Sequence, residues 1–108
     1  MEDEFVDIPG LPHYMVNRRG HILNKRNGNR QATQVAPNGL VTVGLTEAFG
    51  KTMIVVARVV AEAFLEDFDP RYSVEYRDGD RTNLHVDNLK MDFNIKVRGR
   101  KSTRVRMG

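Results

Sequence analysis

The stretch VEYRDGDRTNLHVDNL, residues 74–89, decides how the second half of this chain folds. It begins within a segment of strand-forming residues, Ser73 to Arg77, which runs into the tight-turn sequence Asp78-Gly79-Asp80. Residues 84–86 are predicted to be loop, and Leu89 to Met91 a short returning strand. We therefore expect a hairpin whose two strands are joined by a long polar loop.

Two more hairpins are expected upstream. We place their four short strands at residues 14–16, 21–24, 40–45 and 51–55. Gly20 suits the tight turn of the first hairpin, and Pro9-Gly10 and Pro12 act as breakers before it. Residues 25–38 are polar and contain Asn-Gly turn signals, so we expect a mobile basic loop between the hairpins.

One amphipathic helix follows the second hairpin. The apolar residues Val56, Val59, Val60, Ala63 and Phe64 recur at helical spacing and predict a helix from about residue 55 to residue 65. Its β-branched residues have poor helix propensity, so packing on the hairpin must stabilise it. Strands, one helix and further strands in this order predict a small α+β domain.

Composition limits the classes of function. A chain of 108 residues suits one modest core, and the lack of cysteine excludes disulfides, thiolate zinc sites and cysteine nucleophiles. No apolar run approaches the roughly 18 residues of a membrane span. The acidic start, Met-Glu-Asp-Glu, argues against a secretory signal, so we expect a cytoplasmic protein.

The distribution of charge favours nucleic acid as a partner. The net charge is only +3, but residues 96–108 carry six basic residues and no acid. Twelve of the seventeen basic residues in the chain are arginine, which suits bidentate contacts with phosphate or guanine. The alternative is a solvated tail that only keeps the protein soluble.

Three segments resemble parts of phage HNH homing endonucleases, in the same order. Residues 8–22 are similar to the N-terminal module of these enzymes, residues 56–65 to their Val-His-Arg-Leu-Val-Ala helix, and residues 74–89 to the HNH core. The resemblance implies short antiparallel hairpins, one central amphipathic helix and a degenerate HNH (ββα-metal-like) C-terminal hairpin. A bacterial host is then the expected location.

The resemblance also divides the chain. We expect one domain over residues 1–95, followed by a basic flexible tail. The parts are an N-terminal module at residues 5–24, a hairpin and helix at 40–65, a degenerate HNH hairpin at 73–92 and the tail at 96–108.

The departures from the family lie where its chemistry would be. Tyr76 stands at the general-base histidine, and a phenol with a pKa of about 10 is a poor base at neutral pH. Glu75 stands at an asparagine or metal-binding aspartate, and Ala57 at the helix histidine. Val97 falls near the last metal ligand, on a closing helix that Gly99 shortens or abolishes. Asn88 matches an asparagine that braces the loop.

The histidines, the aspartates near Glu75 and Tyr76 itself leave other roles open. His85 is a substitute base or an exposed loop residue, and His13 and His21 are surface or phosphate-facing residues. Asp78, Asp80 and Asp87 offer a cation site or, preferably, turn chemistry. Tyr76 as a covalent nucleophile is the least favoured reading.

The candidate site residues are therefore basic ones. No catalytic or metal-binding residue is expected, and Glu75, Tyr76 and Asn88 are degenerate positions. The predicted nucleic-acid-binding residues are Arg18, Arg19, Lys25, Arg26, Arg30, Arg58, Arg77, Arg81, Lys96, Arg98, Arg100, Lys101, Arg104 and Arg106. For Arg58, an ion pair with Glu62 one turn later is an equally good explanation.

The expected function is that of a catalytically degenerate, HNH-like protein that grips DNA, most simply double-stranded, through arginine–phosphate contacts. No cofactor and no membrane partner are expected. One alternative is an active Mg²⁺-dependent HNH nicking endonuclease that uses Glu75 and His85. The other is an interaction protein that binds a host factor.

Overall fold

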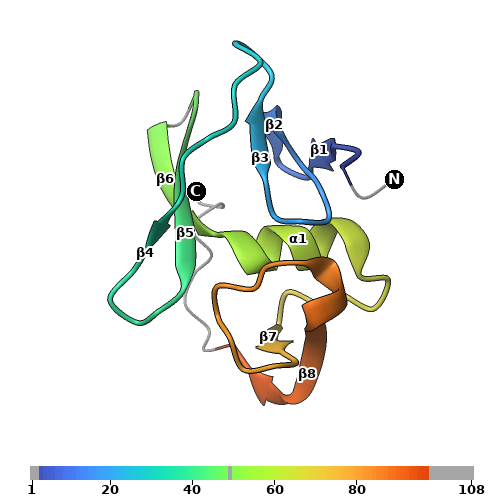
Figure 1. Cartoon of the computed structure of the whole chain (residues 1–108). Helices are drawn as coiled ribbons and strands as arrows, with labels where there is room; N and C mark the ends of the chain where they lie inside the picture. Colours follow the sequence, from blue (N-terminus) through green and yellow to red (C-terminus); the bar gives the residue numbers. More distant parts are fainter. Residues whose placement is uncertain (1–2, 49, 98–108) are drawn as a thin grey trace.

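The computed structural model describes residues 3–48 and 50–97, which form three small antiparallel sheets around one helix, α1 (Val56–Phe64). Figure 1 shows α1 at the centre, with sheet β1-β2-β3 on one side, sheet β4-β5-β6 beside its start and the β7–β8 hairpin below it. The α+β class predicted from the order of the elements is confirmed.

The first sheet is more regular than the sequence suggested. Its strands are β1 (Val6–Ile8), β2 (Leu11–Val16) and β3 (Ile22–Asn24), in the order β1-β2-β3. Pro12 was expected to break the chain but lies inside β2, so that prediction was wrong. The pairing of β1 with β2 shifts register between Asp7 and Ile8, which leaves Pro12 without a partner residue in β1. A strand tolerates proline where no N–H is needed.

The second sheet corrects the prediction of a single mobile loop at residues 25–38. Arg30 forms a bridge with Leu23, and the Gln31 N–H donates to the Ile22 carbonyl oxygen at 2.8 Å, so the chain folds back along β3. The sheet then consists of β4 (Gln34–Val35), β5 (Val41–Glu47) and β6 (Gly50–Val55) in that order. Backbone pairing therefore holds two parts of this segment.

Helix α1 agrees with the predicted helix to within a residue at each end. Val56, Ala57, Val59, Val60 and Ala61 are its buried residues, and they contact all three sheets. The core formed around them also takes residues from each sheet: Ile8, Leu11, Tyr14, Val16, Ile22, Val41, Val43, Leu45, Ile54 and Leu89. Within residues 3–48 and 50–97, no helix has the length and apolar character needed to span a bilayer.

The third sheet pairs β7 (Tyr72–Tyr76) with β8 (Leu89–Lys96), and a 3-10 turn, η1 (Val86–Asn88), leads into β8. Strand β8 was expected to end at Met91 but continues to Lys96. Ser73 pairs with Asp92 while Tyr72 pairs with Lys96, so residues 93–95 bulge out between the two pairs. Up to Val97, the last described residue, no closing helix begins.

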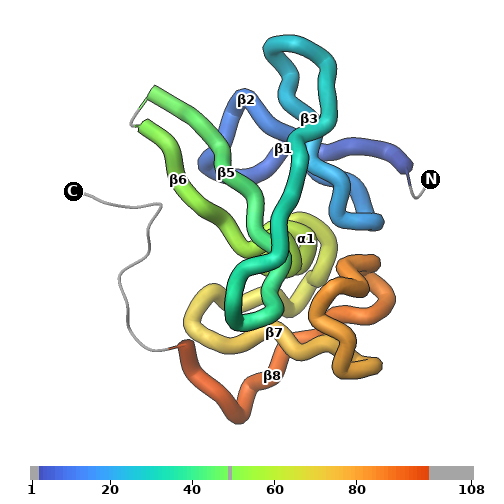
Figure 2. Tube along the Cα trace, turned by 60° about the vertical axis from the view of Figure 1, so that its left-hand side comes forward, coloured from blue at the N-terminus to red at the C-terminus, as the bar shows by residue number. Residues whose placement is uncertain are grey.

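The turn between β2 and β3 is docked on the loop that precedes η1. The Val86 N–H donates to the Arg18 carbonyl oxygen at 2.9 Å. Gly20 has φ +86°, and a Cβ atom there would lie 2.8 Å from Cβ of Leu84. Glycine is therefore needed at this position both for its backbone conformation and for the close approach. Figure 2 follows both segments along the chain trace.

Candidate functional site at the β7–β8 hairpin

An open groove of about 630 Å³ lies where the β7–β8 hairpin meets α1 and the turn between β4 and β5. Figure 2 shows that turn, residues 36–40, reaching down beside β7. The Arg81 Nη1 donates to the Asn38 carbonyl oxygen at 2.5 Å and closes one end of the groove. Apolar side chains of Leu40, Val55 and Val74 line it together with Tyr76.

Tyr76 is the last residue of β7 and is half-buried against the core. Burial raises the pKa of its phenol above the ordinary value, and the positive charges of Arg81 and Arg58 only partly oppose this. The phenol is therefore neutral at physiological pH and holds its proton more firmly than a free tyrosine. It can donate a hydrogen bond, but it does not take a proton from water.

Two carboxylates, Glu75 and Asp92, also line the groove. Glu75 is exposed and pairs across the strands with Lys90, whose Nζ lies 3.8 Å from Oε1 of Glu75. In the part of the chain that the structure describes, no three His, Cys, Asp or Glu side chains gather closely enough to hold a metal ion. Mg²⁺ prefers octahedral oxygen coordination, so Glu75 and Asp92 could supply only part of its ligands, and waters or phosphates would have to supply the rest.

The loop between β7 and η1 is held by its own polar side chains. Asn88, which is buried, accepts from the Asp78 N–H through Oδ1 and donates to Oδ1 of Asp78 through Nδ2, each at 3.0 Å. The side chain of Asn83 donates to the other oxygen of Asp78 at 2.9 Å, and this bond is the main cause of the lowered pKa of that carboxyl. Asp80 accepts from Thr82 in the same loop.

His85 caps η1 and is not a free surface side chain. Its Nδ1 accepts from the Asp87 N–H at 3.0 Å, and the ring is partly buried. In a neutral imidazole whose Nδ1 is an acceptor, the proton lies on Nε2. The ring nitrogen that a general base would use therefore accepts a backbone N–H in the cap.

Comparisons with known proteins show which sequences this chain resembles. No protein-family model matches the chain. It is 30% identical over 91 residues to the H-N-H endonuclease F-TflI of Escherichia phage T5, covering 82% of this chain and 46% of the relative. It is 28% identical over 88 residues to the DNA endonuclease I-HmuI of Bacillus phage SP01, covering 81% and 51%.

A solved structure agrees with these relatives. The structure of the HNH homing endonuclease I-HmuI, solved in a study of DNA binding and cleavage, superposes with a TM-score of 0.77 at 28% identity over 82% of this chain and 52% of that one. This protein is HNH endonuclease-like. It spans about half the length of the relatives that it matches.

In the HNH-like protein, the positions singled out from the sequence lie together in the expected hairpin. Glu75 and Tyr76 end β7, and Asn88 enters β8 and braces the loop as the resemblance implied. Ala57 is buried in α1. Val97 is exposed, and its N–H donates to the Arg71 carbonyl oxygen, so it extends the pairing of β8 and does not begin a helix.

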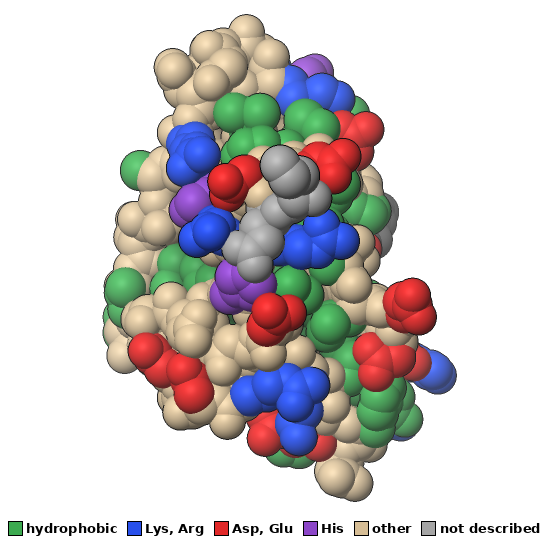
Figure 3. All heavy atoms as spheres, turned by 45° about the vertical axis from the view of Figure 1, so that its right-hand side comes forward, with side chains coloured by type: hydrophobic (Ala, Val, Ile, Leu, Met, Phe, Trp, Pro, Cys, Tyr) green, Lys and Arg blue, Asp and Glu red, His purple; other side chains and the backbone are tan. Residues whose placement is uncertain are grey.

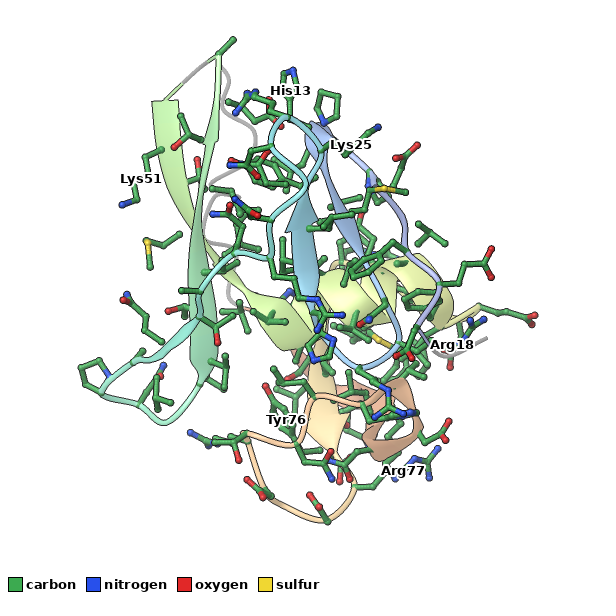
Figure 4. The ribbon with its side chains drawn as sticks, turned by 45° about the horizontal axis from the view of Figure 1, so that its top comes forward. His13, Arg18, Lys25, Lys51, Tyr76 and Arg77 are labelled. Carbon is green, nitrogen blue, oxygen red and sulfur yellow. The ribbon has the colours of Figure 1, made fainter. Side chains whose placement is uncertain are left out.

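The basic residues predicted to bind nucleic acid do not form one cluster. Figure 4 shows Lys25 beside His13 at one end of the first sheet, Arg18 nearer α1 and Arg77 at the β7–β8 hairpin. Figure 3 shows a face on which Lys and Arg alternate with Asp and Glu. Of the basic residues in the tail, only Lys96 is described, and it lies at the exposed end of β8. The predictions for Arg98, Arg100, Lys101, Arg104 and Arg106 fall outside the described residues.

Several of these cations already have a partner within the protein. Arg19 pairs with Asp3 and Lys25 with Asp7, each at 3.1 Å, while Arg18 and Arg30 stack on Phe64 and Phe5. The first two pairs are exposed, so a competing phosphate can replace the carboxylates at little cost.

Arg58 has a structural role that the sequence did not indicate. Its guanidinium donates to the carbonyl oxygens of Tyr72 and Pro70, each at 3.1 Å, and lies over the ring of Phe68. It therefore ties α1 to the segment that leads into β7.

A buried ionic cluster that the sequence reasoning missed joins the first two sheets. Glu47, only 7% exposed, accepts from the backbone N–H of His13 and lies 2.5 Å from its Nδ1. Arg26 lies 3.7 Å from the same carboxylate and donates to the Thr46 carbonyl oxygen. Burial raises the pKa of Glu47, but the bonds from His13 and the charges of His13 and Arg26 outweigh it and leave the pKa below its usual value.

His13 has a half-exposed side chain, as expected of a surface residue, and its ring also binds a carboxylate of β5. Since Nδ1 of His13 lies 2.5 Å from a carboxylate oxygen of Glu47, it is the donor to Glu47 and does not accept a hydrogen bond from the nearby Arg26. A sequence signal existed: Glu47 falls on the inward phase of the alternation Val41, Val43, Leu45.

Proposed function

We propose that this HNH-like protein binds DNA without cutting it. The relative I-HmuI is described as binding and cleaving DNA, and the described part of this chain reproduces its fold over the matched region. The proposal includes DNA binding but not DNA cleavage because of the side chains at the β7–β8 hairpin.

The observation that carries the proposal is the state of the proton acceptors. Tyr76 occupies the family's base position with a raised pKa, and the Nδ1 of His85 accepts a backbone N–H. Phosphodiester hydrolysis by this fold needs a group that takes a proton from water. Glu75, the remaining candidate beside Tyr76, is a weak base that faces Lys90.

A surface suited to DNA lies on the second sheet. Thr42, Gly44 and Thr46 point away from the core, opposite the inward Val43 and Leu45. Lys51 reaches across this face, since a Cβ on Gly44 would lie 2.7 Å from Cε of Lys51. A narrow β-ribbon with polar outward side chains fits the major groove of B-DNA. Figure 4 shows Lys51 on the β5–β6 hairpin, away from Tyr76.

The other cations supply affinity without sequence selection. Arg77 is exposed beside Tyr76, Lys96 is the last residue of β8, and four arginines come after it in the sequence. Arginine–phosphate contacts release counterions, so binding should weaken steeply as salt rises.

Two assays test the proposal together. A gel shift with duplex, single-stranded and RNA probes over a salt series should show salt-dependent duplex binding. A supercoiled plasmid incubated with Mg²⁺ or Mn²⁺ should remain intact. No duplex binding at low salt contradicts the first half, and metal-dependent nicking that disappears in Glu75→Ala contradicts the second.

The second candidate is a nicking endonuclease. It is favoured by the relatives, which are endonucleases by name. In that case Glu75 must bind the metal ion and His85 must leave its cap on η1. Loss of nicking in His85→Ala as well as in Glu75→Ala would support this candidate.

A further inference from the structure

The β2–β3 turn presents a histidine whose tautomer is set by a buried asparagine. Asn17 is fully buried, and its Oδ1 accepts from the N–H groups of Arg19 and His21 at 3.0 and 2.9 Å. Because the oxygen is identified by two donors, the Nδ2 group is the one that faces Nδ1 of His21, at 3.2 Å. The imidazole therefore accepts at Nδ1 and carries its proton on Nε2.

Two arginines flank this ring from different segments. Arg19 lies two residues earlier in the same turn. Arg30 is brought alongside by the backbone pairing of residues 30–31 with β3. The Arg30 guanidinium lies over the ring of Phe5, 5.8 Å from its centroid. Asp3 pairs with Arg19 at 3.1 Å.

The charges around the β2–β3 turn favour the binding of an anion. Burial lowers the pKa of His21 below 6.5, the charges of Arg30 and Arg19 lower it further, and Asp3 opposes them. The free protein thus holds the positive charges of Arg19 and Arg30 near a neutral imidazole whose Nε2 carries a proton. An anion between them would reduce the repulsion and favour protonation of the ring.

We propose that His21, Arg19 and Arg30 form a phosphate site that takes one phosphodiester of bound DNA and couples its binding to protonation of His21. The inference rests on the proposed DNA-binding function and adds a defined contact to it. The phosphate displaces Asp3 from Arg19, since that pair is exposed and weak. From the sequence, His21 was expected only to be a surface or phosphate-facing residue, and it was not in the list of nucleic-acid-binding residues.

The direct test is a pH titration of the His21 imidazole by NMR, in the free protein and with a saturating duplex of about 12 base pairs. The His21 pKa is expected to rise in the complex. One proton taken up on binding can increase duplex affinity by at most tenfold for each unit that the pH falls. An unchanged or lower His21 pKa in the saturated complex overturns the proposal.

Variants separate this site from general DNA binding. His21→Gln keeps a donor but cannot be protonated, so it should bind at high pH almost like the wild type and lose one proton from the pH dependence. Asp3→Asn should bind more tightly, and Arg30→Gln less tightly. His85→Gln is the matched histidine control and should keep the wild-type pH dependence. An identical pH dependence in His21→Gln and the wild type overturns the site but leaves DNA binding intact.

A duplex that does not bind at any pH overturns the proposed function instead. The site is then tested with inorganic phosphate on the same resonance. A rise in the His21 pKa that Arg30→Gln abolishes supports the anion site, and no rise overturns it.

Discussion

Asp78 and Asn88 bond to each other twice across the base of the β7–β8 loop. The Asp78 N–H donates to Oδ1 of Asn88, and Nδ2 of Asn88 returns a bond to Oδ1 of Asp78, each at 3.0 Å. Nδ2 also donates to the Asn83 carbonyl oxygen at 3.0 Å. A single side chain therefore fixes both ends of the loop that separates Tyr76 from β8.

Replacement of Asn88 by alanine should destabilise the fold. The change removes the three hydrogen bonds of the buried Asn88 side chain, and each bond of this kind contributes about 0.5–1.5 kcal/mol. For a domain of this size that loss lowers the melting temperature by roughly 4–8 °C per kcal/mol. Calorimetry of Asn88→Ala against the exposed-site control Asn94→Ala measures it. Equal melting temperatures would show that the hydrogen bonds of the Asn88 side chain contribute nothing to stability.

Gly20→Ala should be more harmful than Gly28→Ala, although both glycines have positive φ. Gly20 has φ +86° and a Cβ there would lie 2.8 Å from Leu84, whereas Gly28 has φ +75° and nothing within 4 Å. Both variants therefore carry the backbone penalty of about 1 kcal/mol, and only Gly20→Ala adds a steric conflict. Urea unfolding of the pair isolates that conflict, and equal losses of stability would refute it.

The His13–Glu47 contact predicts an acid-sensitive contribution to stability. The pKa of Glu47 in the folded state lies below its usual value. The contribution is therefore complete above the unfolded-state pKa and is lost as the pH falls through the folded-state pKa. Urea unfolding between pH 7 and pH 3 should show a smaller pH dependence for Glu47→Gln than for the wild type. Glu66→Gln, at an exposed site, should behave like the wild type.

Restoring histidine at position 76 should not restore cleavage. Tyr76→His supplies an imidazole, but the described residues around it offer no three-ligand metal cluster, and Val97 cannot ligate. A plasmid assay with Mg²⁺ or Mn²⁺ should show intact supercoiled DNA. Efficient nicking by this single variant would mean that the remaining ligands lie elsewhere in the chain.

Removal of the basic tail should flatten the salt dependence of DNA binding. The deletion must follow Val97 and not Phe93, because Lys96 pairs with Tyr72 and the Val97 N–H donates to Arg71. It removes Arg98, Arg100, Lys101, Arg104 and Arg106. If all five contact phosphates, the slope of log K against log salt falls by up to about 4.5, at roughly 0.9 per cation.

The matched control for the deletion keeps the full-length chain and replaces these five basic residues by glutamine. It should reproduce the shallower slope if charge is responsible. A deletion that leaves the slope unchanged would assign the affinity to the described part of the chain.

The sequence predicted the elements whose signals are local. The apolar spacing from Val56 to Phe64 predicted α1 to within a residue at each end, and Asp78-Gly79 predicted the turn after β7. It did not predict β4 or the folding back of residues 30–31, because these paired segments are very short and contain few strand-forming residues, although their partners are close in the sequence.

Contacts between distant side chains were likewise invisible. His13 and Glu47 are 34 residues apart, and Arg81 reaches a carbonyl 43 residues away. For Arg58 the sequence left a DNA contact and an ion pair with Glu62 open, and its guanidinium also donates to two backbone carbonyl groups. A basic residue in a sequence predicts a cation, and only the fold decides whether its donors are already in use.

Because Arg18 and Gly20 pack against residues 84–86, the β2–β3 turn can reach its folded environment only late in synthesis. A ribosome delivers the first sheet long before it delivers the segment that covers the β2–β3 turn. Nascent chains stalled before Leu84 should therefore remain sensitive to protease at that turn, and protection should arise only once Val86 has left the exit tunnel.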